Sequence, residues 1–440
     1  MIEHDRLVVA KFGGSSLADA QRIENAAEIV RSSHNRQFIV VSAPGKRFPE
    51  DEKVTDLLLE TNRLAVEGLP FDQAFEKVAD RFSSIGRQLE CHSVLGWLEE
   101  VHKGLGTHRG EDWVASRGEW LMAQVFASFL DGSFVDATSL IRLRQDGKID
   151  SLSYDLISQQ LTPNSVHYVI PGFYGLGPSG AIQTFARGGT DITGAIIAKG
   201  VNASVYENWT DVDGLRAADP RLIDNPKIID KITYKEMREL GYRGADVLQR
   251  DSILPVFEAG IPINIRNTFN PDHPGTTISR ERKISNGEGI VGIAGRSGFA
   301  AIQIEKFGMN EEYGIGGKIF DVFRQYDLPF ENTPMGLDEM SVIVTEKELN
   351  GKEQELAAAL TKAVEPTDIR ILRNLGLICL VGEGIRKGID RITSEFSSAL
   401  ADANISIRTL SYGTSGNNIV VGVDGDNVPL AIRSIYRALL

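Results

Sequence analysis

Cysteine is nearly absent from this chain of 440 residues, which contains only Cys91 and Cys379. Two cysteines so far apart indicate neither a disulfide framework nor a zinc cluster, which favours a reducing compartment. No apolar run approaches the roughly 18 residues that a membrane-spanning helix needs. The N-terminal residues His4, Asp5 and Arg6 are not typical of a signal peptide. We therefore expect a soluble, cytoplasmic protein that makes no contact with membranes.

Basic residues are also in short supply, with 47 Lys and Arg against 60 Asp and Glu and a formal net charge of −13. The sequence has no run rich in Lys or Arg, which argues against a nucleic-acid partner. An anionic substrate must therefore meet positive charge that is concentrated locally. The hydrophobic fraction of 42% and the chain length suit two or three globular domains.

Several familiar catalytic signatures are missing as well. The chain has no Gly-x-x-x-x-Gly-Lys-Ser/Thr loop and no Ser-His-Asp or Cys-His arrangement. A Gly-x-Gly-x-x-Gly pattern occurs at Gly175, Gly177 and Gly180, but the strand-like residues 181–185 follow it. A dinucleotide-binding turn must instead open a helix directly. We interpret this pattern as a mobile loop near the site.

The first 280 or so residues alternate short β-branched runs with helical patterns, which predicts a parallel sheet with helices on both faces. Between the first two strands, apolar residues recur at helical spacing from Ile23 to Val30, which predicts a helix over about 19–32. The expected strands are residues 7–10, 38–41, 166–170, 203–206 and 262–265.

A change of pattern follows residues 267–289, which are rich in Asn, Pro, Gly and charge and predict a domain boundary. From about residue 290 the order strand, helix, strand, strand, helix, strand is typical of a ferredoxin-like α+β fold. Residues 328–344 can be laid without gaps on residues 405–421. Any two such units would align in part, but we favour two small tandem modules.

Residues 11–16 (Lys-Phe-Gly-Gly-Ser-Ser) end a strand and precede a helix. Glycine lets backbone N–H groups approach phosphate oxygens, and a helix N-terminus and Lys11 both add positive charge. A plain strand-to-helix turn is the alternative.

Residues 187–191 (Arg-Gly-Gly-Thr-Asp) similarly open an apolar helix. Arg187 can clamp a carboxylate, while Asp191 can hold an ammonium or organise a metal and phosphate, the alternative being an N-cap beside an exposed Arg.

Seven motifs occur in an order that resembles the aspartokinase family, and the resemblance covers essentially the full chain. They are residues 11–16, 40–43 (Val-Val-Ser-Ala), 54–58 (Val-Thr-Asp-Leu-Leu), 117–119 (Arg-Gly-Glu), 171–173 (Pro-Gly-Phe), 187–191 and 209–214 (Trp-Thr-Asp-Val-Asp-Gly). The resemblance implies an α/β architecture: an αβα sandwich with the amino-acid kinase fold, followed by two ferredoxin-like α+β ACT domains. The implied domains are a catalytic domain over 1–285, a linker and strand over 286–298, and ACT domains over 299–374 and 375–440.

The same resemblance implies roles for individual residues. Lys11 would neutralise phosphates in the transition state, Asp191 would organise the reacting groups, and Arg187 and Glu119 would hold a carboxylate and the ammonium of aspartate. The implied aspartate-binding residues are Ser42, Thr55, Glu119, Arg187 and Thr190. The implied nucleotide-binding residues are Lys11, Gly13, Gly14, Ser15, Thr210, Asp211, Arg216 and Arg221.

The implied reaction transfers the γ-phosphoryl group of ATP to the side-chain carboxylate of L-aspartate, giving 4-phospho-L-aspartate, the first step towards lysine, threonine and methionine. A carboxylate with a pKa of ~3.9 needs no general base at neutral pH. Mg²⁺ would enter with ATP, and no dedicated protein metal site is expected.

Regulation is implied by the ACT modules, with lysine or threonine as the expected effector. Met309, Asn332, Asp338 and Ser341 lie where the resemblance places it, although they can equally well only build and pack the module. A homodimer through the ACT domains is expected, with a tetramer as the alternative.

Two departures from the family pattern make the inference of ATP binding weaker than that of aspartate recognition. Residues 244–249 (Gly-Ala-Asp-Val-Leu-Gln) put Asp246 where a lysine is frequent, so either Arg243 substitutes for it or Asp246 points away. Arg216 stands where an aromatic residue is frequent. The alternatives are a kinase of the same fold acting on glutamate, acetylglutamate or a nucleotide, and a catalytically impaired amino-acid sensor, which Asp246 and Gln249 would favour.

Overall fold

The computed structural model describes residues 7–107, 109–185, 188–242, 248, 250–284, 289–413 and 416–440. Contacts between residues divide the chain into two compact units. The first comprises residues 1–215, 228–234 and 247–282, and the second comprises residues 216–227, 235–246 and 283–440. Among the described residues, every helix falls short of the length and apolar character that crossing a bilayer requires.

The first unit is built on an eight-stranded sheet. The strands, in spatial order, are β3 (Ser133–Phe134), β4 (Tyr168–Pro171), β2 (Arg36–Val41), β1 (Val8–Phe12), β7 (Val205–Thr210), β9 (Ile263–Asn267), β10 (Thr276–Ser279) and β8 (Lys231–Thr233). The five strands expected from the sequence are all present, and the paired neighbours are parallel except β9 and β10. The sequence missed β10, which lies inside the segment assigned to a domain boundary.

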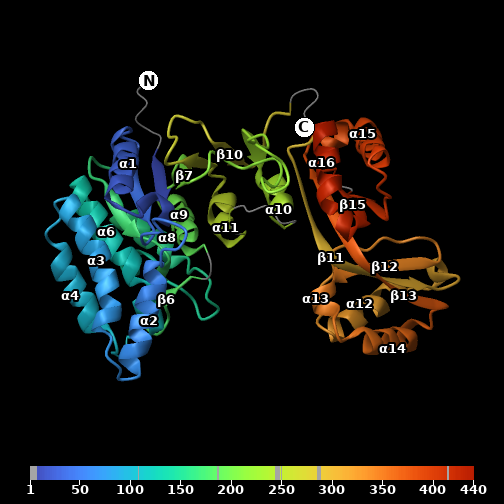
Figure 1. Cartoon of the computed structure of the whole chain (residues 1–440), viewed down its shortest axis with the longest axis horizontal. Coiled ribbons are helices and arrows are strands. Elements are labelled where there is room, and N and C mark those ends of the chain that lie inside the picture. Colours follow the sequence, from blue (N-terminus) through green and yellow to red (C-terminus); the bar gives the residue numbers. More distant parts are fainter. Residues whose placement is uncertain are drawn as a thin grey trace. The chain divides into compact units, whose positions relative to one another are not determined.

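Two layers of helices cover this sheet (Figure 1). On one face a large apolar core joins Ala10 and Phe12 of β1 to α1 (Ala20–Arg31), α6 (Arg117–Leu130) and four further helices. These four are α2 (Val54–Val66), α3 (Asp72–Gln88), α4 (Val94–Gly104) and α5 (Glu111–Ala115). The expected helix over 19–32 is therefore confirmed as α1. Because side chains alternate along a strand, Val9 and Lys11 face the other layer, which contains α9 (Gly189–Gly200), α8 (Leu152–Gln160) and α11 (Arg250–Ala259).

The pattern Gly175-x-Gly177-x-x-Gly180 lies in a hairpin of β5 (Tyr174–Leu176) and β6 (Ile182–Thr184). Gly177 donates its N–H to the carbonyl of Ala181 at 2.8 Å, and Gly180 has φ +78°, which suits glycine. The exclusion of a dinucleotide-binding turn is confirmed, because no helix follows. The interpretation as a loop holds for Gly177 and Gly180, which lie in the turn between β5 and β6, whereas Gly175 belongs to β5.

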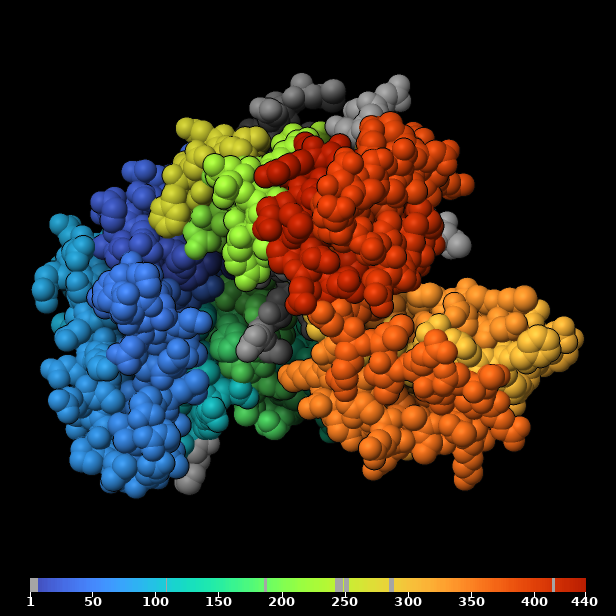
Figure 2. Space-filling view, turned by 45° about the vertical axis from the view of Figure 1, so that its right-hand side comes forward, coloured from blue at the N-terminus to red at the C-terminus, as the bar shows by residue number. Residues whose placement is uncertain are grey.

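The second unit contains a five-stranded antiparallel sheet in the order β12 (Glu339–Thr345), β11 (Gly292–Glu305), β13 (Asp368–Val381), β15 (Asn418–Asp424) and β14 (Thr409–Tyr412). The central strands β11 and β13 have 14 residues each and run through two separate apolar cores. Ile302 and Ile304 belong to the core with α12 (Ile315–Gln325) and α14 (Glu353–Val364), whereas Ile293 belongs to the core with α15 (Ile389–Asp402) and α16 (Val428–Leu439). Figure 2 shows the two halves as orange and red lobes.

The internal repeat predicted from the sequence corresponds to this pair of cores. Residues 342–344 lie in β12 and residues 419–421 lie in β15, and all six side chains are buried. The predicted fold class, a kinase-type α/β domain followed by two ferredoxin-like modules, is thus confirmed. The exact domain boundaries stay a prediction. Residues 216–227 belong by their contacts to the second unit, where Leu222 and Ile223 pack against the core around Ile293.

The packing of α9 on β7 generates a stability prediction. A Cβ atom added to Gly194 would lie 2.6 Å from the ring of Tyr206, closer than real contacts allow. We expect Gly194→Ala to lower the free energy of unfolding by about 1–3 kcal/mol because the core is overpacked. Chemical denaturation of the purified variant measures this.

The matched control is Gly96→Ala in α4, where an added Cβ meets nothing within 4 Å. This substitution should leave stability unchanged or raise it by up to about 1 kcal/mol, because alanine favours helix more than glycine does. Equal effects of both variants would contradict the close packing of α9 on β7.

Candidate active site

Three side chains meet between β1, β7 and the start of α9. The ammonium of Lys11 lies 2.6 Å from Oδ1 of Asp191 and donates to Oδ1 of Asn208 at 3.3 Å. The amide Nδ2 of Asn208 donates to the same Asp191 oxygen at 2.9 Å. Lys11 and Asn208 are almost completely buried. A buried ammonium needs such partners, because an unpaired charge out of water is very costly.

Local backbone geometry explains this meeting. In the parallel ladder between β1 and β7, Lys11 is paired with Asn208, so both side chains project from the same face of the sheet. The N-cap of α9 is Gly188, whose φ of +77° is left-handed, and Asp191 lies in the first turn. The capping alternative for Asp191 is therefore wrong, because its carboxylate binds Lys11 and Asn208 instead.

The turn after β1 packs tightly against a second turn. Gly13 donates its N–H to the carbonyl of Trp209 at 3.1 Å, and Gly45 donates to the carbonyl of Gly14 at 2.8 Å. A Cβ atom on Gly14 would lie 2.8 Å from the carbonyl oxygen of Ala43, so only glycine fits there. A 3₁₀ helix (Gly14–Leu17) and then α1 follow directly. The sequence gives this turn the small residues that close backbone approach requires.

Beside this turn lies a pocket of about 680 Å³. Five residues singled out from the sequence line it: Gly14, Ser15, Thr55, Glu119 and Asp211. Three cationic side chains also line it and were missed: Arg22, Lys46 and Lys53. These cations supply the local positive charge that an anionic ligand requires in an acidic protein.

Glu119 is the most perturbed acid of the pocket. Its carboxyl group is buried in the first part of α6, and burial raises its pKa to about 7 despite hydrogen bonding to backbone and the charge of Arg117. Among the described residues, its Oε2 has no hydrogen-bond partner. Arg117 does not face a ligand, since it donates to the carbonyl of Trp113 and stacks between Trp113 and Trp120. The pocket thus presents an unsatisfied carboxylate that suits a cationic group.

Other predicted residues lie near the pocket without lining it. Ser42 follows β2 and donates its N–H to the carbonyl of Phe12 at 3.2 Å, and Thr190 packs against Gly172. The hydroxyl of Thr210 donates to Asp211 at 3.2 Å.

The predicted roles of several other residues stay predictions. Arg216 and Arg221 belong to the second unit, where Arg221 pairs with Asp219 at 2.6 Å. Arg187 lies outside the described residues, as do Arg243, Asp246 and Gln249.

The residues that sequence reasoning missed differ in how they could have been found. Asn208 directly precedes the 209–214 motif, and its pairing with Lys11 follows from the β1–β7 register, which is a long-range property. Lys46 and Lys53 both precede the motif at 54–58 and could have been proposed from charge alone. In the described part of the chain, no group of three or more His, Cys, Asp or Glu side chains is arranged to hold a metal ion.

The four residues proposed for an effector have different surroundings in the second unit. Met309 is buried in the core around Ile302, and the Asp338 carboxylate accepts the N–H of Gly308 at 2.8 Å. The side chain of Asn332 accepts the N–H of Thr333 at 2.8 Å. Only Ser341 of the four lines the 210 Å³ pocket on the sheet. Three of them therefore contribute visibly to the module's own structure.

Comparisons with known proteins agree with this architecture. A model of the amino acid kinase family matches residues 6–267, and a model of the ACT domain matches residues 378–439. Aspartokinase 3 of Bacillus subtilis is 33% identical over 450 residues, which cover 98% of each chain. The bifunctional aspartokinase/homoserine dehydrogenase 1 of Arabidopsis thaliana is 28% identical, but the match covers only 51% of that longer protein.

Solved structures show the same similarity. The aspartate kinase of Clostridium acetobutylicum, described as an allosteric enzyme, matches with a TM-score of 0.87 and 41% identity over 99% of this chain and 100% of that one. Aspartokinase III of E. coli, solved with aspartate and ADP, matches with a TM-score of 0.72 over 98% of this chain and 99% of that one. Its identity of 23% supports the fold alone.

Burial of Glu119 generates a prediction for the pH dependence of stability. The carboxyl pKa is about 4.5 in the unfolded chain and about 7 in the folded one. The folded state therefore keeps the proton to a higher pH than the unfolded state does. The free energy of unfolding falls as the pH rises from about 4.5 through 7. Relative to Glu119→Gln, the free energy of unfolding of the unaltered protein should fall by about 2 kcal/mol between pH 5.5 and 8.

Denaturation of the ligand-free proteins across this pH range measures the difference. Glu99→Gln is the matched control, because the Glu99 carboxylate is exposed and pairs with Lys103. Curves that stay parallel for Glu119→Gln and the unaltered protein would show that Glu119 is not held in a raised-pKa state.

Proposed function

This chain belongs to the amino acid kinase family as an aspartokinase, and we propose that Lys11, Asp191 and the adjoining pocket carry out its reaction. That reaction transfers the γ-phosphoryl group of ATP to the side-chain carboxylate of L-aspartate and yields 4-phospho-L-aspartate. The observation that carries the assignment of the site is the ion pair of the buried Lys11 with Asp191, beside a pocket lined by cations and by the carboxylate of Glu119.

The chemical step needs charge compensation more than proton transfer. The acceptor carboxylate is ionised at neutral pH, since its pKa is ~3.9, so it attacks without a general base. Negative charge on the transferred group is met by Lys11, which is positioned by Asp191 and Asn208. A positioned charge in a buried site stabilises the transition state without reorganisation.

Aspartate binding is proposed for the side of the pocket formed by α2 and α6. The ionised form of Glu119 accepts the substrate ammonium, which removes the cost of its unpartnered oxygen. Thr55 lies in the first turn of α2, whose free N–H groups favour a carboxylate. Arg187 is proposed for the second carboxylate, with Ser42 and Thr190 as neighbouring contacts.

Nucleotide binding is proposed for the turn after β1. Gly13, Gly14 and Ser15 offer backbone N–H groups to the phosphates, and Arg22, which donates to the carbonyl of Ser15 at 3.0 Å, adds a cation there. Thr210 and Asp211 are proposed for the nucleoside, Arg221 for the phosphates, and Arg216 as a further nucleotide-binding residue. Mg²⁺ would enter with the nucleotide and supply further charge neutralisation, and Asp191, which pairs with Lys11, would help to organise it.

Loss of the Lys11 charge tests this assignment. We expect Lys11→Met to lower kcat by about 10³-fold, because the positive charge that meets the transferred phosphoryl group is removed. Acyl phosphate formed from aspartate and ATP is trapped with hydroxylamine and measured over time. Lys103→Met, at an exposed helix position, is the matched control and should keep full activity.

Retention of full activity by Lys11→Met would show that the turn after β1 is not catalytic. Absence of acyl phosphate with the unaltered protein would instead contradict the kinase activity itself.

Regulation by an end-product amino acid is proposed for the ACT modules, with lysine or threonine as effector and with Met309, Asn332, Asp338 and Ser341 as candidate contacts. The support is the ACT match at residues 378–439 and the double-core architecture of the second unit. Assembly into a homodimer through these modules, or further into a tetramer, is proposed with it.

Isothermal titration with lysine, threonine and methionine tests the regulatory proposal. We expect heat of binding and inhibition with lysine or threonine, and a reduced affinity for Ser341→Ala if the pocket on the sheet is the site. Absence of heat and of inhibition with all three amino acids would remove the proposal while leaving the kinase assignment intact.

A further inference from the structure

The loop between β2 and α2, residues 42–53, forms a large part of the active-site pocket. Half of the residues that line the pocket come from this loop, including the cations Lys46 and Lys53. Several of its side chains are exposed, and its chain makes no sheet pairing. Side-chain contacts therefore add to the few backbone hydrogen bonds that hold it, such as that from Gly45 to Gly14. Whatever fixes the loop therefore fixes one wall of the pocket.

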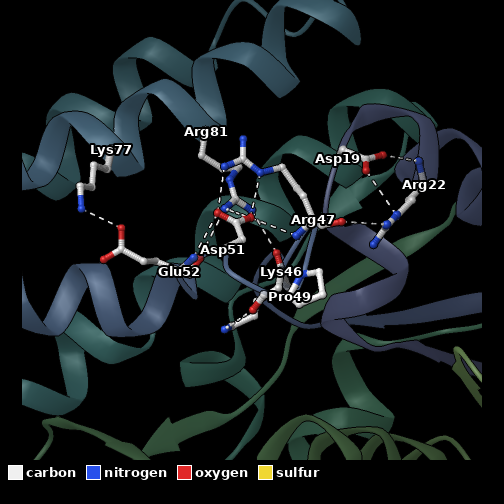
Figure 3. A network of polar contacts seen from close by, with 10 residues as sticks. Asp19, Arg22, Lys46, Arg47, Pro49, Asp51, Glu52, Lys77 and Arg81 are labelled. Atoms are coloured by element: carbon white, nitrogen blue, oxygen red, sulfur yellow. Dashed lines mark hydrogen bonds and ion pairs between the residues drawn. The ribbon is translucent and has the colours of Figure 1, made fainter.

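The carboxylate of Asp51 is the centre of these contacts (Figure 3). It accepts three hydrogen bonds from Arg47, from the backbone N at 3.0 Å, Nε at 2.8 Å and Nη2 at 2.9 Å. It accepts a fourth from Nη2 of Arg81 at 2.6 Å. Asp51 is 8% exposed, and the hydrogen bonds from Arg47 hold its pKa well below the usual range. The loop is thus closed on itself by one buried anion.

Arg81 connects this anion to the rest of the domain. It projects from α3, is only 5% exposed, and burial lowers its pKa. Its Nη1 donates to the carbonyl of Gly45 at 3.0 Å, and its Nη2 also reaches the carbonyl of Glu52 at 3.4 Å. Gly45 in turn donates its N–H to the carbonyl of Gly14 at 2.8 Å. Arg81 therefore contacts both ends of the loop, and through Gly45 the loop is hydrogen-bonded to the turn after β1.

The cost of this arrangement argues for a positioning role. The side chains of Arg81 and Asp51 are removed from water, although Arg47 is 44% exposed. A buried ion pair stabilises a fold no better than apolar side chains of similar volume. The arrangement does, however, define a single loop geometry, because a planar guanidinium binds in fixed directions. The neighbouring pair Glu52–Lys77 joins the same loop to the same helix at 2.7 Å, but both side chains are 57% exposed, so it restricts the loop little.

We propose that Asp51 and Arg81 are positioning residues for the acceptor substrate, which hold the 42–53 loop in the conformation that binds aspartate. This proposal rests on the proposed function of the pocket. The turn at Gly13 and Gly14 is less dependent on the loop, because Gly13 also bonds to Trp209 and Ser16. The nucleotide side should therefore be affected less than the acceptor side.

Steady-state kinetics of Asp51→Asn test the proposal, with acyl phosphate trapped by hydroxylamine. We expect KM for aspartate to rise at least tenfold, with kcat and KM for ATP changing less than threefold, because ground-state positioning of one substrate is lost. Arg81→Met and the double variant should show about the same rise as Asp51→Asn, since the two residues act as one unit. Glu52→Gln is the matched control and should stay within twofold of the unaltered protein in all three constants.

Hydrogen exchange of the ligand-free proteins gives a readout that does not need activity. Backbone amides of residues 44–53 should exchange faster in Asp51→Asn than in the unaltered protein or in Glu52→Gln. If the unaltered protein forms no acyl phosphate, the proposed function fails. Hydrogen exchange still shows whether Asp51 and Arg81 hold the 42–53 loop. An unchanged KM for aspartate, a loss confined to kcat, or unchanged exchange in the loop would each overturn the positioning role.

Discussion

The ion pair between Lys11 and Asp191 is the constraint on which the site depends. It joins the C-terminal end of β1 to the first turn of α9, two segments 180 residues apart in the chain. An ammonium buried this deeply requires a fixed anionic partner, so the strand, the helix start and β7 must pack in one arrangement. The close contact of Gly194 with Tyr206 supports it, because it brings α9 directly onto β7. The packing of these three elements therefore sets the position of the site.

Positive charge gathers at the pocket although the chain as a whole is acidic. The chain has a formal net charge of −13, yet the pocket is lined by Arg22, Lys46 and Lys53. Glu119 balances them with a carboxylate whose pKa of about 7 lets it ionise when a cationic group arrives. A zwitterionic acceptor with two carboxylates fits this combination better than a purely anionic ligand, because its ammonium and its carboxylates each meet a group of opposite charge.

The sequence predicts those parts of the structure that follow from local pattern. Short β-branched runs identify β1 and β2, and apolar residues at helical spacing identify α1. Lys11 and Asp191 stand out because each belongs to a motif with two adjacent glycines at the start of a helix. Contacts set by long-range register could not be predicted, which is why Asn208 was missed although it touches both residues. The strand β10 was missed because only its partners β9 and β8 make that polar segment pair.

Chain connectivity gives regulation a physical route. Residues 216–227 begin five positions after Asp211 of the pocket and are hydrogen-bonded into the second unit. Ile293 of β11 donates its N–H to the carbonyl of Ala217 at 2.7 Å, and the Tyr436 hydroxyl of α16 accepts the N–H of Lys227 at 2.8 Å. The strand β11 belongs to both ACT-type cores, so a ligand that favours one arrangement of either core acts on a strand bonded to this segment. Such a ligand changes the activity only if it binds two arrangements of the core with different affinities. The shared strand provides the element on which that difference can act.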